Sequence, residues 1–553
     1  MIPDLDLSMI PDAGSRQAIQ ALLQLVETLS AENRTLRAEV QRLRDEISRL
    51  KGEQGTPTIP PKRRKDPPPA PTDHASEAER HIPTPHQKGR KVPMIVINRT
   101  EPCGVDPAIL PPDAELKGHE TVIVQDLRLQ IDNVAFVKEK WYAPSTGQTS
   151  LAPLPAGYDG TFGPNIKALA LVLHDATNVR QPLMLVLFQQ AGTQISAGTL
   201  AAWLIHDQAA FHAEKDAIVE AGLASSPWQQ IDDTATRVNG HNQVCQVLGN
   251  PLYTAYRTAK SKTRLAVLDT LRNGRPRTFR LNDDALVYLD ALGLARATRQ
   301  RRLLALPWDQ EQDEATLTAR LATHLPTLGD RARKWIMDAL AVAAYHAQVG
   351  FPVIRLLLCD DAPQFHLLGD DLALCWVHEG RHYKKLTPCV PTHQRALARL
   401  QTRFWAFYRG LLIYRARPDP AAKGRLIRGF DRLFATVTGY AALDERIANT
   451  RSKQAGLLLV LDHPEIPLHN NAMELGARRR GRKRDVSFGP RTDAGARAWD
   501  TFQTIIATAQ KLGVNAFHYI RDRRSGAPQL PALADLITER AATLSLGASW
   551  PRA

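Results

Sequence analysis

An acidic side chain close to a dense run of arginines is the first candidate for chemistry. The sequence His-Asn-Asn-Ala-Met-Glu ends at Glu474, and a strongly basic segment begins at Arg478. Asn470 or Asn471 can cap a helix by accepting hydrogen bonds from the backbone N–H groups of its first turn. Glu474 and Arg478 then share one face of that helix. A carboxylate beside a cationic ridge suits a metal ion that acts on a phosphate backbone, whereas the alternative is a charged, solvated helix.

Two upstream segments offer carboxylates that could complete such a site. Asp232 and Asp233 lie in an expected strand over residues 229–238 and point to opposite faces of it, so only one can join a given site. Asp360 follows the apolar segment 354–359, which fits a buried strand and ends where ligand sites of α/β sheets gather. Carboxylates on a first strand, after a later strand and on a helix can together hold two Mg²⁺ ions for an in-line displacement at phosphorus.

Basic side chains near these carboxylates are the candidate DNA contacts. After a short strand expected over 372–377, His378 and Arg381 are spaced to share one face of a new helix. The other candidates form the basic segment, namely Arg478, Arg479, Arg480, Arg482, Lys483 and Arg484. The formal net charge of +14 agrees with an anionic partner such as nucleic acid, although a basic excess can also serve solubility alone.

Residues 19–51 carry the clearest local pattern in the chain, five heptads with apolar a and d positions. The d positions are Leu22, Leu29, Leu36, Leu43 and Leu50, and four a positions are β-branched while the fifth is Asn33. This combination favours a parallel two-stranded coiled coil, and one asparagine at a fixes its register. The acidic g positions Glu32, Glu39 and Glu46 would face the basic e positions Arg37, Arg44 and Lys51 of the partner. We therefore expect a homodimer; a helix packed on its own chain is the alternative.

The remaining sequence predicts a mixed α/β and α protein of several units. After the coil (1–51), we expect a proline-rich basic linker (52–98), a small β unit (99–160), a helical region (161–226), a core (227–525) and a tail (526–553). The core needs helical insertions near 271–345 and 391–458 to span the long separations between its carboxylates. In the helical region, a helix, a glycine turn and a second helix capped by Ser196 have the outline of a helix-turn-helix, which ordinary helical hairpins share.

Cysteine spacing and hydropathy indicate the redox state of the thiols and the cellular location of the protein. The five cysteines, at positions 103, 245, 359, 375 and 389, form no CxxC pair, so neither a disulfide framework nor a zinc knuckle is indicated. No apolar run is long enough to span a membrane, and no signal peptide is evident. We therefore expect reduced thiols, no membrane partner and a cytoplasmic location.

Several motifs together resemble the TnpC transposases of bacterial insertion sequences of the IS sixty-six type, over roughly residues 90–525. The segment His469 to Glu474 resembles the family's Asp-Asn-Asn-Ala-x-Glu-Arg, with His469 and Leu475 as departures from it. Three further matches are Asp232-Asp233-Thr234 for Asp-Glu-Thr, Asp360 with Phe365 for Asp-Gly-Tyr-Ala-Gly-Tyr, and Cys375-Trp376-Val377-His378 for Cys-Trp-x-His. The family's cysteine-rich zinc segment survives only as Cys103, so zinc is not expected.

The resemblance implies a DDE transposase with a ribonuclease H-like core, in which Asp232, Asp360 and Glu474 hold two Mg²⁺ or Mn²⁺ ions. Its partners would be double-stranded DNA, both terminal inverted repeats and target DNA, a second copy of the chain, and helper proteins of the same element near the bacterial nucleoid. Two alternatives remain, a catalytically silent DNA-binding protein derived from a transposase and a structure-specific nuclease. Acidic residues at all three positions favour an enzyme, and the expected coil favours pairing of two DNA ends.

Overall fold

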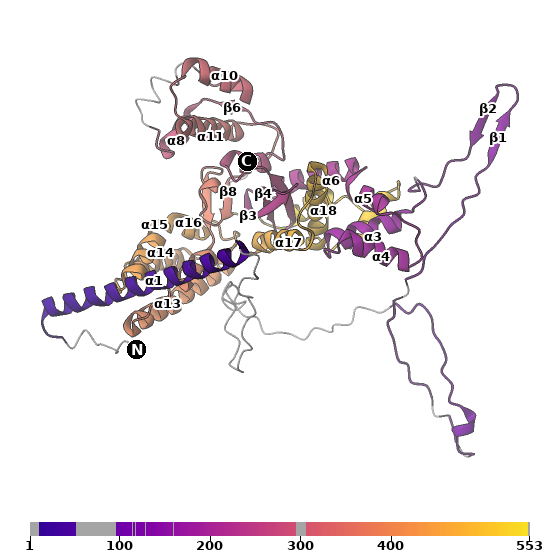
Figure 1. Cartoon of the computed structure of the whole chain (residues 1–553), viewed down its shortest axis with the longest axis horizontal. Coiled ribbons are helices and arrows are strands. Elements are labelled where there is room, and N and C mark those ends of the chain that lie inside the picture. The colour runs from indigo at the N-terminus through magenta and orange to yellow at the C-terminus, as the bar shows by residue number, and fades with distance from the viewer. Residues whose placement is uncertain are drawn as a thin grey trace.

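A five-stranded mixed sheet lies at the centre of the molecule, with helical units on either side of it (Figure 1). The computed structural model describes residues 10–50, 96–294 without 113, 117, 128 and 159, residue 303, and residues 306–550. Lys51 and nearly all of the expected proline-rich linker, 52–98, lie outside the described residues. Within those residues, no helix combines the length and the apolar character needed to cross a membrane.

The sheet combines an antiparallel half with a parallel half in the order β5-β4-β3-β8-β9. Its strands are β3 (Trp228–Val238), β4 (His241–Asn250), β5 (Tyr253–Ala259), β8 (Leu356–Cys359) and β9 (Asp371–Leu374). The first three form an antiparallel meander, and β8 and β9 run parallel to β3. Asn239 and Gly240 join β3 to β4 with positive φ angles of 49° and 77°, as a tight two-residue hairpin requires. Three of these strands, β3, β8 and β9, overlap the segments 229–238, 354–359 and 372–377 that the sequence predicted as strands.

Alternating side chains of β4 pack against helices on opposite faces of the sheet. Leu248 belongs to the large apolar core shared with α6 (Ala209–Ala224) and α7 (Arg264–Leu271). Val247, its neighbour, faces the other way and packs with Met473 and Ala477 of α17 (Asn471–Ser487). The sheet is therefore covered on both faces, which fixes where α17 lies relative to β3 and β4.

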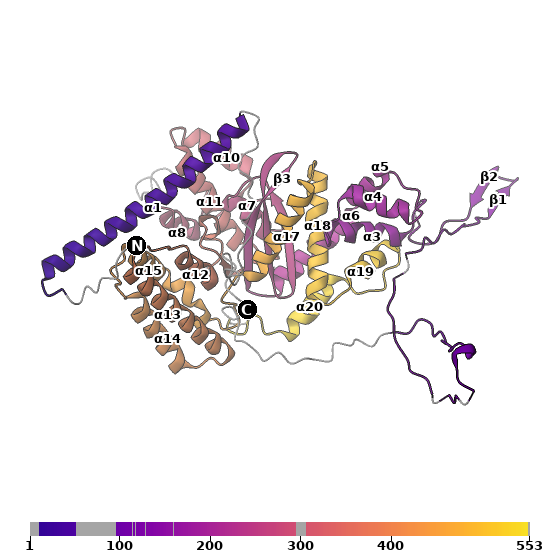
Figure 2. The ribbon, with the colours of Figure 1, turned by 60° about the horizontal axis from the view of Figure 1, so that its bottom comes forward.

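Helix α18 (Asp493–Lys511) runs beside α17 and covers the free edge of β5 (Figure 2). Asp500, Thr504 and Thr508 repeat every four residues and so form one stripe on the helix. Their side-chain oxygens accept hydrogen bonds from the backbone N–H groups of Thr258 (2.7 Å), Tyr256 (3.0 Å) and Thr254 (3.3 Å). The helix thereby satisfies donors that an edge strand would otherwise expose.

Two helical insertions interrupt the sheet, as the separation of the carboxylates required. Between β5 and β8 lie α7, α8 (Asp283–Ala291), α10 (Glu314–His324) and α11 (Asp330–His346), with the two-residue strands β6 (Phe279–Arg280) and β7 (Glu311–Gln312). Between β9 and α17 lie α12 (Trp376–Lys384), α13 (Pro391–Ala416), α14 (Pro420–Phe434), α15 (Ala441–Ser452) and α16 (Gln454–Leu458). The second insertion has its own aromatic core around Trp376, Phe404 and Phe430.

A third helical group lies at the other end of the sheet. It contains α3 (Pro164–Asp175), α4 (Gln181–Gln190), α5 (Ala197–Ile205), α6, α19 (Ala516–Arg524) and α20 (Leu533–Thr543). Ser196 caps α5 by accepting from the Thr199 N–H at 3.1 Å, as the sequence predicted. The prediction of a tail over 526–553 was wrong for the described part, because α20 packs on α6 and the Trp228 indole donates to the Leu546 carbonyl at 2.6 Å.

The small β unit predicted over 99–160 is reduced to one hairpin. The strands β1 (Lys140–Ala143) and β2 (Gln148–Leu151) pair with each other and project from the body (Figure 1). Within the expected β unit, the segments 121–131 and 133–141, which are rich in β-branched residues, are almost entirely without regular structure and largely exposed. The β-branched side chains of these segments face no apolar layer, and β propensity without burial does not hold a sheet together.

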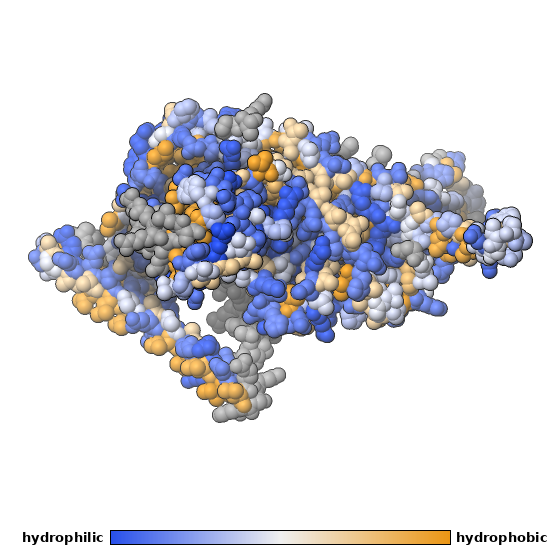
Figure 3. Space-filling model, turned by 90° about the horizontal axis from the view of Figure 1, so that it is seen from above, coloured by the Kyte–Doolittle hydropathy of each residue, from blue (hydrophilic) through white to orange (hydrophobic). Residues whose placement is uncertain are grey.

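Helix α1 (Ala13–Leu50) forms as the heptads predicted, and it packs on the second insertion of its own chain. The leucines at the d positions stay exposed, with exposed fractions of 60% for Leu22, 64% for Leu36 and 79% for Leu50. Figure 3 shows such side chains as an orange row along the rod formed by α1. The helix is thus observed, whereas its pairing with a second chain stays a prediction.

Candidate metal and nucleic-acid site

Three elements bring Asp232, Asp360 and Glu474 to one end of the sheet. Asp232 lies within β3, Asp360 directly follows β8, and Glu474 lies in the first turn of α17. In the parallel pairing of β3 with β8, Gln230 is opposite Leu358, and the same register continued by two residues places Asp232 beside Asp360. Helix α17 crosses β3 and β4 and adds the third carboxylate. The predicted constellation therefore converges in space.

The electrostatics of Asp232 show how closely the three carboxylates interact. Burial, together with the charges of Glu474 and Asp360, raises its pKa to about 7, against a hydrogen bond from the Asp233 N–H that lowers it. Burial also raises the pKa of Asp360, with His378 opposing that shift. Carboxyl groups held together and away from water resist ionisation unless a cation is supplied.

Glu474 already has two cationic neighbours from α12. Arg381 donates to Glu474 Oε2 at 2.6 Å, and His378 Nδ1 lies 3.6 Å from Glu474 Oε1. Burial alone would raise the pKa of Glu474, but His378 and Arg381 outweigh it and lower the value to about 2. In return, Cys375 and Glu474 raise the pKa of His378 to about 10. The sequence assigned His378 and Arg381 to DNA, and the structure places both against the third carboxylate.

Buried atoms without a hydrogen-bond partner mark the place where a cation fits. Asp360 Oδ1, Glu474 Oε1 and His378 Nδ1 are all in this condition, and all belong to the same site. Buried polar atoms are normally paired, so the two carboxylate oxygens without a hydrogen bond, Asp360 Oδ1 and Glu474 Oε1, suit a cationic ligand. Hard oxygen ligands from carboxylates are what Mg²⁺ or Mn²⁺ prefers, and the three acidic side chains fit that requirement.

One further residue at this point was not predicted as part of the site. Ligand atoms of Cys375, His378 and Glu474 lie within 4.8 Å of one another, so a thiol adjoins the oxygen cluster. Cys375 is the residue before α12, and its sulfur accepts a hydrogen bond from the Asn470 N–H at 3.3 Å. The sequence feature that could have identified it is the spacing Cys-x-x-His, which puts both side chains on the first turn of a helix.

The strand predicted over 372–377 ends at Leu374 instead, because Trp376 turns into the aromatic core of the second insertion.

The start of α17 is fixed by side chains that reach across the sheet. Asn470 occupies the N-cap position, but it does not cap the helix through its side chain as predicted. Its amide nitrogen donates to the Ile231 carbonyl at 2.6 Å, and its amide oxygen accepts from Gln230 at 3.3 Å. The Asn471 N–H donates to His469 Nδ1 at 3.4 Å. Asn470 therefore ties the helix that carries Glu474 to the residue before Asp232.

The acidic neighbours Asp233 and Asp361 are both held by lysines. Asp233 pairs with Lys262 at 2.7 Å and also raises the pKa of Asp360, so it lies close to the site despite its alternate position on β3. Asp361 pairs with Lys453 at 2.8 Å. Hydrogen bonds from His366 and Lys453 lower its pKa to about 2. Each of these two carboxylates therefore has a lysine partner within the chain.

The prediction of DNA contacts does not hold for Arg480 and Lys483. The Arg480 side chain has an exposed fraction of 0% and pairs with Asp500 at 2.8 Å. The Lys483 side chain has an exposed fraction of 2% and pairs with Asp175 at 3.0 Å. Both lie on the side of α17 that faces α18 and α3, where a charge must be paired to be buried. They hold the helix in place rather than binding DNA.

The other members of the basic segment remain accessible. Arg482 is exposed, and Arg478, Arg479 and Arg484 are half-buried. Arg479 donates to the Gln510 side chain at 3.0 Å, and Arg484 donates to the Ala235 carbonyl at 2.6 Å. Arg478 and Arg482 follow Glu474 at intervals of four residues and therefore extend from the carboxylate site along one face of α17.

Comparison with known proteins identifies a relative without identifying a function. An uncharacterized protein of Sinorhizobium fredii, y4jO, is 32% identical to the chain over 316 residues, which are 55% of this chain and 94% of y4jO. The chain therefore belongs to the same family as y4jO. No family model matches the chain. No solved structure matches it either.

Proposed function

We propose that the chain is a DNA transposase of the IS sixty-six type with a ribonuclease H-like core. It would bind the ends of an insertion sequence, cut there, and join the freed 3′-hydroxyl to target DNA. The observation that carries this proposal is the convergence of Asp232, Asp360 and Glu474 at one end of the sheet. The placement of these carboxylates on a first strand, after a later parallel strand and on a helix agrees with the pattern of that core.

The chain's own residues divide the work at such a site. Asp232, Asp360 and Glu474 would hold two Mg²⁺ or Mn²⁺ ions, which when bound supply charge for the attacking and leaving oxygens of an in-line displacement. Arg478 and Arg482 are placed to bind phosphates of the DNA that enters the site. Arg381 and His378 orient Glu474 and balance its charge.

The proposed partners are double-stranded DNA, comprising terminal repeats and target, and a second copy of the chain. The exposed heptad leucines of α1 support the second copy, since an apolar stripe of this length is otherwise left in water. The α4–α5 pair is the candidate helix-turn-helix for reading the repeats, on the basis of its helix–turn–helix outline.

Labelled DNA that carries the inverted repeats flanking the gene provides the test. The parent chain should cut at the repeat end only when Mg²⁺ or Mn²⁺ is present, and should then join that end to a second duplex. Binding without cutting would favour the catalytically silent DNA-binding protein. Cutting at branched DNA without joining would favour the structure-specific nuclease. Failure to bind the repeats would remove the proposal.

A further inference from the structure

Helix α1 presents two separate stripes, of which only one is used within the chain. The residues that contact the rest of the chain occupy the b, e and f positions of the heptads: Gln20, Leu23, Gln24, Glu27, Ser30 and Arg34. The a and d positions form the other stripe. Leu29 and Leu36 there have exposed fractions of 54% and 64%, although they flank the contact residues in sequence. The a positions Ile19 and Val26 are half-buried, so this stripe lies partly against the body in the first two heptads, whereas from Leu29 onward it is exposed and does not compete with packing on the same chain.

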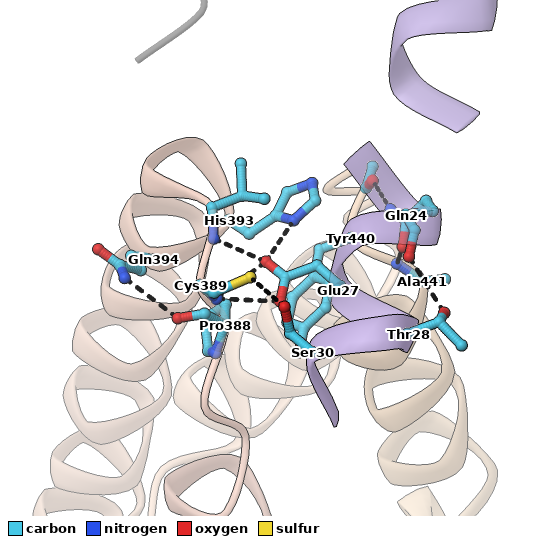
Figure 4. Close-up of polar contacts among 12 residues, drawn as sticks. Gln24, Glu27, Thr28, Ser30, Pro388, Cys389, His393, Gln394, Tyr440 and Ala441 are labelled. Carbon is cyan, nitrogen blue, oxygen red and sulfur yellow. Dashed lines mark hydrogen bonds and ion pairs between the residues drawn. The ribbon is translucent and has the colours of Figure 1, made fainter. Parts of the chain in front are cut away.

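Glu27 is the centre of the contact with the second insertion (Figure 4). Its carboxylate, on a residue with an exposed fraction of 6%, accepts from the backbone N–H groups of Cys389 at 2.9 Å and Val390 at 2.8 Å. Val390 is the N-cap residue of α13, so this carboxylate from another helix supplies the acceptor that the cap lacks. His393 Nδ1 lies 3.1 Å from the same carboxylate and stacks on Tyr440. We call this group, Glu27 with Cys389, Val390 and His393, the Glu27 clamp.

A second contact fixes α1 to the start of α15. Gln24 donates to the Gly439 carbonyl and accepts from the Ala441 N–H at 3.2 Å (Figure 4). Arg34 donates to the Thr387 carbonyl at 3.1 Å. Helix α1 is therefore attached at the beginnings of two helices, α13 and α15, and at the segment that joins α12 to α13.

Both attachment points lead directly to the carboxylate site. Glu379 of α12 is buried and accepts from Thr450 at 2.6 Å, and it pairs with Arg446, also of α15. Lys453, just after α15, lies 3.4 Å from Glu379 and 2.8 Å from Asp361, the residue after Asp360. On the same helix, His378, next to Glu379, and Arg381, two residues further on, contact Glu474. The start of α15, which Gln24 contacts, is thus connected to α12 through the length of α15 and its polar contacts with Glu379.

The charges of the heptads match this division of the helix. In the first two heptads the e positions are the uncharged Leu23 and Ser30, which face the second insertion. Cations occupy the e positions only further on, at Arg37, Arg44 and Lys51, opposite the acidic g positions Glu32, Glu39 and Glu46. Residues 35–44 are all exposed, so this part of α1, past the Arg34 contact with Thr387, projects beyond the body. A projecting single helix of this length is marginal in water without a partner.

We propose that α1 is a connector that joins two copies of the chain through its a and d stripe and, through the Glu27 clamp, sets the position of α12 at the carboxylate site. This inference rests on the proposed function, which it deepens by linking pairing of the chains to paired cutting of two DNA ends. Glu27 is in this sense a positioning residue. Its carboxylate contacts Cys389, Val390 and His393 and none of the three ligand carboxylates.

The first test separates the two stripes and requires no activity. Ser30 and Cys389 are in contact, with Oγ and Sγ 3.5 Å apart, so Ser30→Cys in a Cys103→Ser full-length chain should form a disulfide with Cys389 under mild oxidation. The double variant Leu36→Glu and Leu43→Glu should reduce the mass in light scattering to one chain and leave the disulfide yield unchanged. Glu27→Gln should leave the mass at two chains and lower the disulfide yield about tenfold or more, because two hydrogen bonds to a charged acceptor are weakened.

The second test measures the link to the site. With DNA that carries two repeat ends, Glu27→Gln should give about tenfold fewer products cut at both ends, and cuts at single ends should continue. Asp45→Asn, at the f position of the projecting part, is the matched control and should match the parent. The minor fraction of the Glu27→Gln, Ser30→Cys chain that does form the disulfide with Cys389, once separated from the reduced chain, should regain two-ended cutting, which a loss of stability elsewhere would not allow.

The outcomes distinguish the connector from the proposed function. If the parent cuts no DNA while mass and disulfide yields behave as stated, the transposase proposal fails and the two-stripe arrangement of α1 stands. If Glu27→Gln cuts both ends at the parental rate, the link from α1 to the site is refuted. In the Leu36→Glu and Leu43→Glu variant, the disulfide yield at Ser30→Cys could fall together with the mass in light scattering. That result would show that one surface serves both contacts, and it would overturn the two-stripe arrangement.

Discussion

At the scale of the residue, the main feature of the site is that its three carboxylates have fewer cationic partners than negative charges. Within the part of the chain that the structure describes, Asp232 has no ion pair of its own, and burial with its acidic neighbours raises its pKa to about 7. Glu474 has Arg381 and His378, which hold its pKa near 2. Two groups of the same chemical type are thus set in opposite states by position, and a divalent cation between them would restore the charge of Asp232.

Replacement of each carboxylate by its amide tests this arrangement. Asp232→Asn, Asp360→Asn and Glu474→Gln should each lower Mg²⁺-dependent cutting of repeat-end DNA below detection, because an amide lacks the charge that offsets the metal. DNA binding, measured by gel shift, should change less than about threefold. Asp361→Asn is the matched control, since Lys453 already neutralises that carboxylate, and it should be milder. Parental cutting by Glu474→Gln would refute the assignment of the triad.

The basic segment of α17 offers a second residue-scale prediction, in which neighbouring arginines behave differently. Arg480→Met should lower the free energy of unfolding by about 3–5 kcal/mol, because it leaves Asp500 buried without its partner. Arg482→Ala should change it by less than about 0.5 kcal/mol. In the same variant, the slope of log affinity against log salt should become shallower by up to about 0.9 for each phosphate that the arginine neutralises in the parent. Urea unfolding measures the free energies of unfolding, and salt titrations of DNA binding measure the slope. Equal stability of the two variants would contradict the burial of Arg480.

At the scale of the element, the sequence predicted what local periodicity determines. The strands around Asp232, the strand before Asp360 and the helix that begins near Glu474 were all recognisable, because hydrophobic alternation and turn residues mark them. The strand expected over 372–377 was too long, since an apolar run does not tell a strand from a helix that enters an aromatic core. Likewise, no local pattern says that Arg480 and Lys483 face Asp500 and Asp175, which lie on other helices.

The stripe of α18 that covers β5 gives the prediction for this scale. Thr504 Oγ1 accepts from the buried Tyr256 N–H at 3.0 Å. Thr504→Val keeps the shape and removes the acceptor, so the free energy of unfolding should fall by about 1–3 kcal/mol. Thr538→Val on the exposed face of α20 is the control, and its free energy of unfolding should fall by less than about 0.5 kcal/mol. Chemical denaturation of both variants measures these free energies of unfolding. Equal losses of stability in the two variants would mean that the Tyr256 N–H at the edge of β5 has another acceptor.

At the scale of the whole molecule, α1 joins parts that the sequence left separate. The heptads predicted a helix and its apolar stripe correctly, yet Glu27 was unremarkable there, because its partners are the backbone N–H groups of residues more than 360 positions away. Contacts of this kind depend on the folded second insertion and leave no trace in composition or spacing. The same holds for the Asn470 hydrogen bond to Ile231, which fixes α17 on the sheet.

The Glu27 clamp makes the attachment of α1 dependent on pH. Burial alone would raise the pKa of Glu27, but the N–H groups of Cys389 and Val390 lower it below its usual value. A lowered pKa means that the clamp stabilises the folded state above the ordinary carboxyl pKa of about 4.3, and that this contribution is lost as the pH falls through the lower value. His393 Nδ1 contacts the same carboxylate and stacks on Tyr440, so protonation of Glu27 also weakens its contact with His393. Helix α1 should then detach before the sheet unfolds.

Hydrogen exchange measured by mass spectrometry tests that order of events. Between about pH 7 and pH 3, protection of the peptide over residues 385–394 should be lost at a higher pH than protection of α18, after correction for the intrinsic exchange rate. In Glu27→Gln, the same peptide should be poorly protected at every pH, because the amide is a weaker acceptor and does not titrate. Asp45→Asn should follow the parent. If the 385–394 peptide and α18 lose protection together in the parent, α1 is not held by a titrating clamp, and the whole chain unfolds as one unit in acid.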